Sequence, residues 1–475
     1  MNRTLVRVLI VSYLILPFFA LLWKLGAWSL PERPELFAAL GFTLKQATLS
    51  AFFSVAFGFA GALGLLRSRA LRRPLEILFF LPNLLPTLFV LAACLKFFSP
   101  FPFGLAGIVL VHVVLNTGLA AVSIARILES RVGGWAELAL VEGASRWRFF
   151  RAAFPSLGSD LGAVFLFIFA ICFASLTVPL VAGRFDGYTT EVLIYEKVRV
   201  GGQWDQALGL SMVQTAIIFA LTLALSRNTL ALNPVSRNLS LLATGWGSTL
   251  PVIFSLIVIV GMFEGVARGI AQLTPLQEAL MSAWHGTWIV GLGVGLSTFA
   301  LSSAIVFASP HHAFQKFLSG YVAPSSVLTG FGILLFGIPL SDLGLMILGI
   351  TLVQLPLFFR LYLNGPLEGV APQAAVARTL GAKWSLIFRK ITLPQLAGPI
   401  GFTAGLSAFW ACGEFALSSL LTTQSTTLAL FAKGLLASYR LEAATAVLWI
   451  LMFTGTVLWL SFWGVAYGLG SKSHS

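Results

Sequence analysis

The sequence predicts an all-α polytopic membrane protein with about twelve transmembrane helices arranged as two parallel repeats. Three observations lead to this fold class. Hydrophobic residues make up 58% of the chain and charged residues only 10%, whereas charged residues make up about 25% of a soluble domain. Apolar runs long enough to cross a bilayer recur along the chain. A basic, amphipathic segment also occurs twice, far apart in the sequence.

The individual spans follow from apolar runs of about 20 residues, the length of helix that crosses the hydrocarbon core. Short polar or charged stretches separate these runs. The predicted spans are residues 5–23, 43–66, 75–98, 105–125, 161–182, 207–225, 248–263, 285–308, 322–340, 343–363, 396–421 and 443–467.

The distribution of lysine and arginine predicts how these spans are oriented. Most of these residues fall in alternate connecting segments, and the positive-inside rule places those segments in the cytoplasm. Both termini and both basic segments are then cytoplasmic. Because this topology explains the net charge of +13, we expect the lipid bilayer as a partner and no nucleic acid.

The repeated basic segment covers residues 137–155 and 375–394. Each copy has a Gly-Ala pair, beginning at Gly143 and at Gly381, followed by aromatic and basic residues and then a proline. Glycine permits a turn with positive φ, and we expect the proline to end the turn before the next span. Each copy should form a compact knob of two helices. The alternative is a basic helix that lies on acidic lipid headgroups.

Both copies resemble the cytoplasmic EAA loop of permeases from binding-protein-dependent ABC importers. The resemblance implies the type I ABC importer permease fold. The first copy has Leu138 in the middle of the Glu-Ala-Ala position, and the second has Ala375 in place of the glutamate. The first copy is also one residue shorter between its glycine and its proline. The ATPase-coupling residues that the resemblance implies are Glu137, Ala139, Gly143, Ala144, Ala377, Gly381, Ala382, Ile391 and Pro394.

The same resemblance implies partners and a location. We expect two copies of a cytoplasmic ABC ATPase, a periplasmic or lipid-anchored solute-binding protein, and a small molecule or ion as substrate. The location would be the bacterial cytoplasmic (inner) membrane. The chain has no Gly-Lys pair and therefore no ATP-binding loop of the Gly-x-x-x-x-Gly-Lys type. We expect ATP and Mg²⁺ on the ATPase partner. This chain should have no cofactor, metal or catalytic residue of its own and should not be an enzyme.

The repeat divides the chain into five segments. The predicted boundaries are 1–42 for an extra N-terminal helix, 43–226 for the first permease repeat, 227–283 for a cytoplasmic linker with a second extra helix, 284–468 for the second permease repeat, and 469–475 for a cytoplasmic tail. Each repeat would hold five core spans, with the basic loop between the third and the fourth. Parallel repeats pack about an axis normal to the membrane, with the transport path between them.

Single-chain permeases that carry both halves are typical of the thiamine and ferric-iron importers. Within that group, residues 104–116, 172–175, 189–195 and 438–440 look most like the thiamine permease. We therefore expect the permease subunit of an ATP-driven thiamine importer. The alternative solute is ferric iron.

A secondary transporter driven by protons or sodium is the less favoured alternative class. Carriers of that class hold several buried acids, or broken helices in matched positions. The predicted spans hold Glu414, with Asp342 and Glu442 near span edges. The matched feature of this chain is instead the basic loop.

Two polar residues mark a candidate substrate path. Ser175 and Glu414 occupy matched positions in the spans that follow the two basic loops, and we expect them to face each other across the repeat axis. A charge inside a span costs about 2.5–3.5 kcal/mol on insertion scales, so Glu414 should face the protein interior or the outer mouth of the path. The alternative role for Glu414 is a hydrogen bond to a helix terminus near the outer end of its span.

Overall fold

The computed structural model describes residues 3–24, 28–67, 69–183, 188–226, 242–309, 314, 318, 325–422, 424 and 426–471. These residues form helices joined by short turns, and none of them lies in a strand. Residues 227–241 of the predicted linker and residues 472–475 of the predicted tail lie outside the described residues.

Two compact units make up the chain, and each is assembled from segments that are separated in the sequence. The first-repeat unit comprises Leu30–Leu193 and Val213–Val266. The second-repeat unit comprises Met1–Ser29, Ile194–Met212 and Ala267–Ser475. Each unit has its own helices and its own apolar core.

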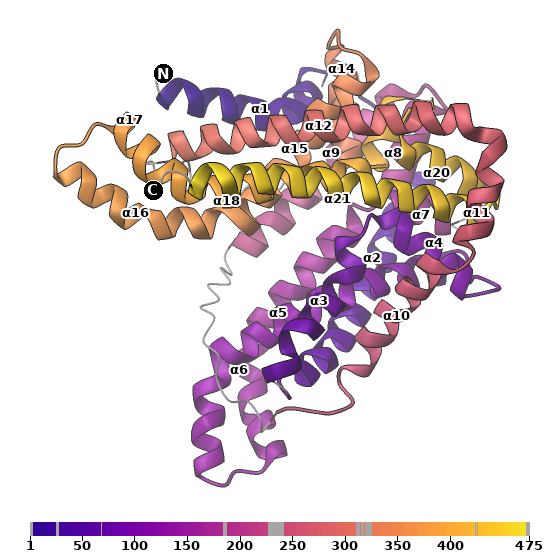
Figure 1. Ribbon diagram of the computed structural model, residues 1–475. Helices are drawn as coiled ribbons and strands as arrows, with labels where there is room; N and C mark the ends of the chain where they lie inside the picture. The colour runs from indigo at the N-terminus through magenta and orange to yellow at the C-terminus, as the bar shows by residue number, and fades with distance from the viewer. Residues whose placement is uncertain are drawn as a thin grey trace. The chain divides into compact units, whose positions relative to one another are not determined.

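The helices of the first-repeat unit cover the apolar runs of the sequence (Figure 1). They are α2 (Arg33–Leu65), α3 (Arg69–Leu84), α4 (Thr87–Phe97), α5 (Leu105–Val141), α6 (Arg146–Phe173), α7 (Thr177–Ala182) and α10 (Thr249–Phe263). Helices α2, α5 and α6 extend ten or more residues beyond these runs. Two further helices, α8 (Thr190–Arg199) and α9 (Trp204–Ser226), contribute residues to both units.

The second-repeat unit contains helices from both ends of the chain and two π-helical turns, η3 and η4. Its elements are α1 (Arg3–Trp23), α11 (Val266–Leu273), η2 (Thr274–Leu276), α12 (Gln277–Ala308), α14 (Ser326–Phe336), α15 (Asp342–Phe358), η3 (Phe359–Leu363), α16 (Asn364–Thr379), α17 (Trp384–Ile387), η4 (Phe388–Thr392), α18 (Leu393–Cys412), α19 (Ala416–Leu421), α20 (Leu428–Ala437) and α21 (Leu441–Ser471).

Several described helices are long and apolar enough to cross a membrane. There are five such stretches, or six if the bent pair α3 and α4 counts as one span: Arg33–Leu65, Leu105–Val141, Arg146–Phe173, Thr249–Ala308 and Leu441–Gly468, with Leu71–Leu84 and Thr87–Phe97 as the pair. Shorter apolar helices cover Ser326–Phe336, Asp342–Phe358 and Leu428–Ala437. This composition confirms an all-α polytopic membrane protein. The number of twelve spans and the repeat type stay predictions.

The predicted span at residues 75–98 differs from the structure, because it is bent. Helices α3 and α4 meet at an angle of 95°. Pro86 stands at the bend as the N-terminal cap of α4, with φ −54° and ψ 136°. Proline has no backbone N–H, and its ring disfavours the helical conformation for Leu85 before it. The apolar run continues on both sides of Pro82, Asn83 and Pro86, so its length alone predicted one straight span.

The two predicted extra helices correspond to α1 and α10. Helix α1 packs within the second-repeat unit and α10 within the first. Helix α1 contacts α12 and α14, and α10 contacts α3 and α4. Val6, Ile10 and Leu14 of α1 are buried in the core of the second-repeat unit. The apolar face of α1 is therefore covered by helices that come late in the sequence.

Small residues bring the helices of the first-repeat unit close together. A Cβ atom at Gly118 of α5 would lie 1.8 Å from the carbonyl oxygen of Phe79 in α3. Only glycine fits at such a distance, and close backbone approach is the common way in which membrane helices associate. This contact fixes α3 against α5, the helix that leads to the first basic loop.

Candidate functional site

The first basic segment forms a helical hairpin. We call residues 129–160 the first hairpin; it joins the end of α5 to the start of α6 (Figure 1). Gly143 has φ +64°, and its N–H donates to the carbonyl of Leu140 at 3.2 Å. The N–H of Ala144 donates to the carbonyl of Ala139 at 2.8 Å. This pair of bonds is the Schellman motif that ends a helix at a left-handed glycine.

The second basic segment repeats this turn bond for bond. We call residues 364–392 the second hairpin; it consists of α16, α17 and η4. Gly381 has φ +82°. Its N–H donates to the carbonyl of Arg378 at 3.0 Å, and the N–H of Ala382 donates to the carbonyl of Ala377 at 3.1 Å. The turns predicted at both Gly-Ala pairs are therefore present.

Both hairpin tips expose apolar side chains. Leu138 and Val376, which lie five residues before the two glycines, are 61% and 60% exposed. Leu380 is 81% exposed. A Cβ atom at Gly143 or Gly381 would have no neighbour within 4 Å. Exposed apolar groups around an open turn are typical of surfaces that bind another protein.

The remaining predicted coupling residues lie near the two tips, except Ile391 and Pro394, which lie near the base of the second hairpin. Glu137 is exposed on α5, while Ala375 is exposed on α16 and lines a pocket of about 120 Å³ together with Arg378 and Thr392. The following coupling residues are partly exposed: Ala139, Ala144, Ala377, Ala382, Ile391 and Pro394. Of the predicted coupling residues, only Pro394 lies outside the two hairpins, in the first turn of α18.

The expected role of the two prolines is wrong. Pro155 lies inside the continuous helix α6, and Pro394 lies in the first turn of α18, which follows η4 directly. Neither proline ends a turn. In both hairpins the second arm runs on as helix into the next apolar stretch.

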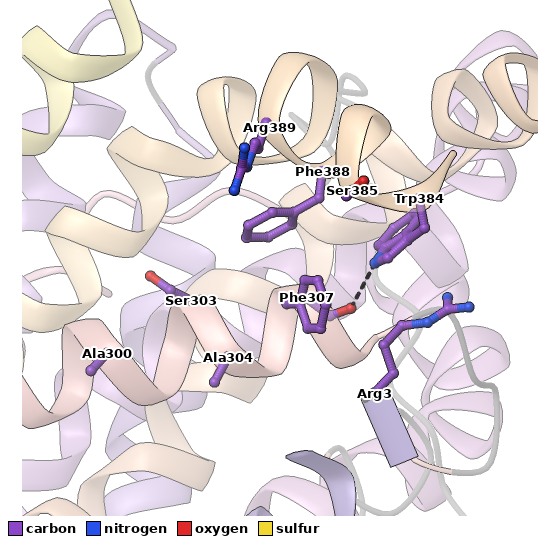
Figure 2. A pocket seen from close by; sticks show the side chains of 9 residues that line it. All are labelled: Arg3, Ala300, Ser303, Ala304, Phe307, Trp384, Ser385, Phe388 and Arg389. Carbon is purple, nitrogen blue, oxygen red and sulfur yellow. Dashed lines mark hydrogen bonds between the residues drawn. The ribbon is translucent and has the colours of Figure 1, made fainter. Parts of the chain in front are cut away.

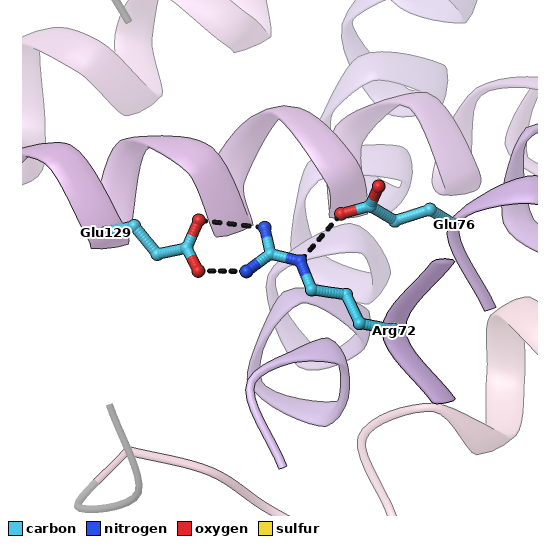
Figure 3. A network of polar contacts seen from close by, with 3 residues as sticks. All are labelled: Arg72, Glu76 and Glu129. Carbon is cyan, nitrogen blue, oxygen red and sulfur yellow. Dashed lines mark hydrogen bonds and ion pairs between the residues drawn. The ribbon is translucent and has the colours of Figure 1, made fainter. Parts of the chain in front are cut away.

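Ion pairs hold the first hairpin to its neighbours (Figure 3). Arg72 of α3 forms a two-pronged pair with the buried carboxylate of Glu129, and its Nε also donates to Glu76 at 2.8 Å. Arg131 of α5 donates to both carboxylate oxygens of Asp160 in α6, at 2.9 and 3.1 Å. Planar guanidinium groups suit such two-pronged pairing. These bonds connect α3, α5 and α6 at the base of the hairpin.

Helix α1 supports the second hairpin. The guanidinium of Arg3 lies 5.4 Å from the centre of the Trp384 ring. The indole Nε1–H of Trp384 donates to the carbonyl of Phe307 at 3.1 Å, and Arg7 donates to the carbonyl of Ala308 at 2.9 Å. The base of this hairpin is therefore fixed to α1 and to the end of α12 by one aromatic side chain.

A threonine makes the same bridge in each unit. The hydroxyl of Thr43 in α2 accepts the backbone N–H of Thr190 at 2.8 Å. The hydroxyl of Thr287 in α12 accepts the backbone N–H of Leu428, also at 2.8 Å. Each hydroxyl donates in turn to a carbonyl of its own helix, one turn earlier. The doubling of the chain therefore extends from the loops into the buried helices.

Comparison with curated proteins found relatives that align along nearly the whole chain. The chain is 26% identical to the thiamine transport system permease protein ThiP of Escherichia coli (strain K12), over 94% of this chain and 92% of that protein. It is 27% identical to the protein of the same name from Salmonella typhimurium, over 90% of this chain and 89% of that protein. No family model and no solved structure matches the chain.

This chain is a relative of the fused two-half ABC permeases. The relatives support an ABC importer permease in a multi-pass inner-membrane location. They are transport permeases rather than enzymes.

The two polar residues of the predicted path of the permease occupy equivalent places. Ser175 follows the end of α6, and Glu414 follows the end of α18. The N–H of each bonds to the carbonyl three residues earlier, and each is followed by a six-residue helix, α7 or α19. The carboxylate of Glu414 accepts the N–H of Leu417 at 2.9 Å, so it caps the start of α19. This bond agrees with the alternative role predicted for Glu414. The facing of Ser175 and Glu414 across a path stays a prediction.

The residues that hold the two hairpins were not among the predicted site residues. Glu129 stands between Arg126 and Arg131, a pattern that could have indicated an intramolecular ion pair, whereas Asp160 has no basic residue near it in the sequence. The two bridging threonines stand within three residues of the predicted starts of the repeats, and their match could have been noticed by aligning those starts. No sequence signal links Arg3 to Trp384, because the contact depends on how α1 packs.

Proposed function

We propose that this chain forms the translocation pathway of an ATP-driven importer for thiamine. Two copies of a cytoplasmic ABC ATPase would each seat one hairpin, and a periplasmic or lipid-anchored binding protein would deliver the solute. Both termini and both hairpins would lie on the cytoplasmic side. The chain itself would bind no ATP, Mg²⁺ or other cofactor, and Ser175 and Glu414 would line the path.

The observation that carries the proposal is the pair of matched hairpins. Both end their first helix at a left-handed glycine with the same two hydrogen bonds, and both tips present exposed apolar side chains. A symmetric pair of identical ATPase subunits requires two equivalent docking elements, because each subunit offers the same groove. The names of the relatives supply the choice of thiamine.

Leucine at Gly143 or Gly381 tests the docking of the hairpins. The new side chain would project from an open turn, where a partner groove would meet it. We expect each variant to insert in the membrane, to lose co-purification of the ATPase subunit, and to lose thiamine-stimulated ATP hydrolysis in proteoliposomes. Leucine at positive φ also strains the backbone by about 1–2 kcal/mol, independently of any partner.

Gly337 provides a matched control for that strain. It has φ +62° at the end of α14, and a Cβ atom there would also have no neighbour within 4 Å. Gly337→Leu should therefore carry the same backbone cost but keep the ATPase subunit bound. If all three leucine variants behave alike, the loss comes from strain and the docking assignment is wrong. A complex that docks its ATPase but transports a solute other than thiamine would contradict the substrate alone.

A further inference from the structure

A pocket of about 730 Å³ lies at the base of the second hairpin (Figure 2). Three segments form it: the start of α1, the last two turns of α12, and α17 with η4. All belong to the second-repeat unit. The residues that line it are Arg3, Ala300, Ser303, Ala304, Phe307, Trp384, Ser385, Phe388 and Arg389. Its volume is in the range of pockets that hold small organic ligands.

The lining of this pocket is amphipathic. Ala300, Ala304 and the rings of Phe307 and Phe388 form an apolar floor, and the two rings pack edge to face with centres 5.2 Å apart. Figure 2 shows Arg3 beside Trp384 on one side of these rings and Arg389 on the other. A ligand that fills the pocket must therefore combine an apolar part with a polar or charged part.

The charge of the lining indicates an anion. Two of the nine lining residues are arginines, and none is acidic. Arg3 lies over the Trp384 ring, and neither Arg3 nor Arg389 forms an ion pair with an acidic side chain of the described residues. Trp384 uses its indole N–H on a backbone carbonyl, and Ser303 donates to the carbonyl of Phe299. The two guanidinium groups and the Ser385 hydroxyl are thus the side-chain donors left for a ligand.

The position of the pocket limits the source of such an anion. Helix α12 belongs to an apolar stretch long enough to cross the membrane, and the pocket lies beside its final turns. A free phosphate ion would leave the apolar floor unused. A phospholipid would use both parts, because basic pockets between membrane helices on the cytoplasmic side bind anionic headgroups.

We propose that this pocket binds an anionic phospholipid of the cytoplasmic leaflet. Arg3 and Arg389 would pair with its phosphate, and an acyl chain would lie along Ala300, Ala304 and the two phenyl rings. The choice of leaflet rests on the proposed function, which places the second hairpin in the cytoplasm. The bound lipid would join α1, α12 and the second hairpin at the place where the base of that hairpin must stay fixed.

Binding of defined lipids to the full-length protein in detergent tests the proposal. Native mass spectrometry would count dioleoyl phosphatidylglycerol and dioleoyl phosphatidylcholine molecules that remain bound. We expect a preference for phosphatidylglycerol that falls about fivefold for Arg3→Gln or Arg389→Gln and about thirtyfold for both together, because each basic residue near anionic lipid contributes about 1 kcal/mol. Inorganic phosphate and glycerol phosphate should not displace the lipid.

Arg151 is the matched control for Arg389. Both stand eight residues after the glycine of their hairpin, and both are exposed. Arg389 lines the pocket, whereas Arg151 does not. Arg151→Gln should keep the phosphatidylglycerol preference. Ala304→Trp should abolish it while both arginines remain, because the indole would fill the floor.

Three results would overturn the proposal. An unchanged preference in the double glutamine variant would place the lipid elsewhere. An equal loss in Arg151→Gln would mean that only the overall charge matters. Displacement by inorganic phosphate would mean that the pocket binds an anion without a lipid. None of these measurements uses the ATPase subunit or transport. The lipid proposal can therefore be wrong while the docking proposal is right, and the docking proposal can be wrong while the lipid proposal is right.

Discussion

The two hairpins have the same tip but are supported in different ways. Each tip has a left-handed glycine and the same two capping bonds. Behind the tip, the first hairpin is held by the Arg72–Glu129 and Arg131–Asp160 pairs. The second is held by apolar packing and by the contact between Arg3 and Trp384. The shape of the tip is common to both hairpins, whereas the means of fixing it is particular to each repeat.

The helices behind the two tips also differ in length and in whether they contain a π-helical turn. Helix α5 is regular over 37 residues, whereas the corresponding stretch Asp342–Thr379 is one residue longer and contains the π-helical turn η3. The second hairpin is also one residue longer between its glycine and its proline, and it contains η4. A π-helical turn holds one more residue than an α-helical turn. Each π-turn therefore absorbs one residue, and the helix face beyond it keeps its direction.

Single-residue deletions test this explanation and should have the largest effect. Deleting Lys390, within η4, should convert the π-turn to a regular α-turn and leave α18 in register. Helix α6 contains no π-turn that could compensate for the deletion of Arg151, so the rest of α6 should rotate by about 100°. That rotation would turn the buried residues Leu157 and Asp160 away from the core. We expect the first deletion to yield a folded protein and the second to yield little or none, as judged by size-exclusion chromatography in detergent.

An equal loss of folded protein from the two deletions would mean that η4 does not accommodate an extra residue. An alanine inserted after Arg151 provides the complementary variant. It should give the first hairpin the length of the second and form a π-turn there, with a smaller loss of stability than the deletion of Arg151 causes.

Removal of a carboxylate separates the two modes of support and should have an intermediate effect. Glu129→Ala removes the buried partner of Arg72, whose side chain is 21% exposed and keeps Glu76 as a partner. The cost should therefore stay below the about 3–5 kcal/mol of breaking a fully buried ion pair. We expect a clear drop in the apparent Tm of the purified protein. Glu368→Ala in the second hairpin is the control, because Glu368 is exposed and, among the described residues, accepts a hydrogen bond from the Asn364 amide alone. Similar Tm values for the two variants would contradict a special role for ion pairs in the first hairpin.

The missing glutamate of the second hairpin should have the smallest effect. Ala375 is exposed and lines the small pocket beside Arg378 and Thr392, so Ala375→Glu can be accommodated without a clash. An exposed ion pair with an ATPase subunit would contribute about 0.2–1 kcal/mol, or at most about fivefold in affinity. Glu137→Ala should weaken binding by a similar factor, and much less than Gly143→Leu. Titration of the ATPase subunit onto the immobilised permease would measure both, and a larger loss for Glu137→Ala than for Gly143→Leu would contradict this ranking.

Local features of the sequence were enough to predict the hairpin turns and the fold class. Gly143 and Gly381 could be recognised because a left-handed cap depends on a few neighbouring residues. The bend at Pro86 was missed, because proline is tolerated in many membrane helices and the hydrophobic run continues past it. Pro155 was expected to end a turn, but it lies inside a continuous helix. A proline breaks a helix or is tolerated in it depending on whether neighbouring groups can bond the carbonyl that it leaves free.

Long-range contacts were beyond the sequence. The pairing of Arg72 with Glu129 joins residues far apart in the chain, and many other carboxylates could have served. The packing of α1 on the second-repeat unit reverses the chain order, which no local pattern encodes. The coupling role of the residues named from the sequence stays a prediction, while the elements that brace the two hairpins had to be seen in three dimensions.

The place of α1 has a consequence for how the protein is made. Its packing partners, α12 and α14, are translated roughly 300 residues after it, and at about 5–20 residues per second a ribosome needs about 15–60 s to reach them. During that time α1 can only be held by lipid or by the insertion machinery. Helix α1 therefore reaches its native neighbours only after most of the chain has been made. Assembly of the second-repeat unit must wait for α12 and α14, although α1 is already in place.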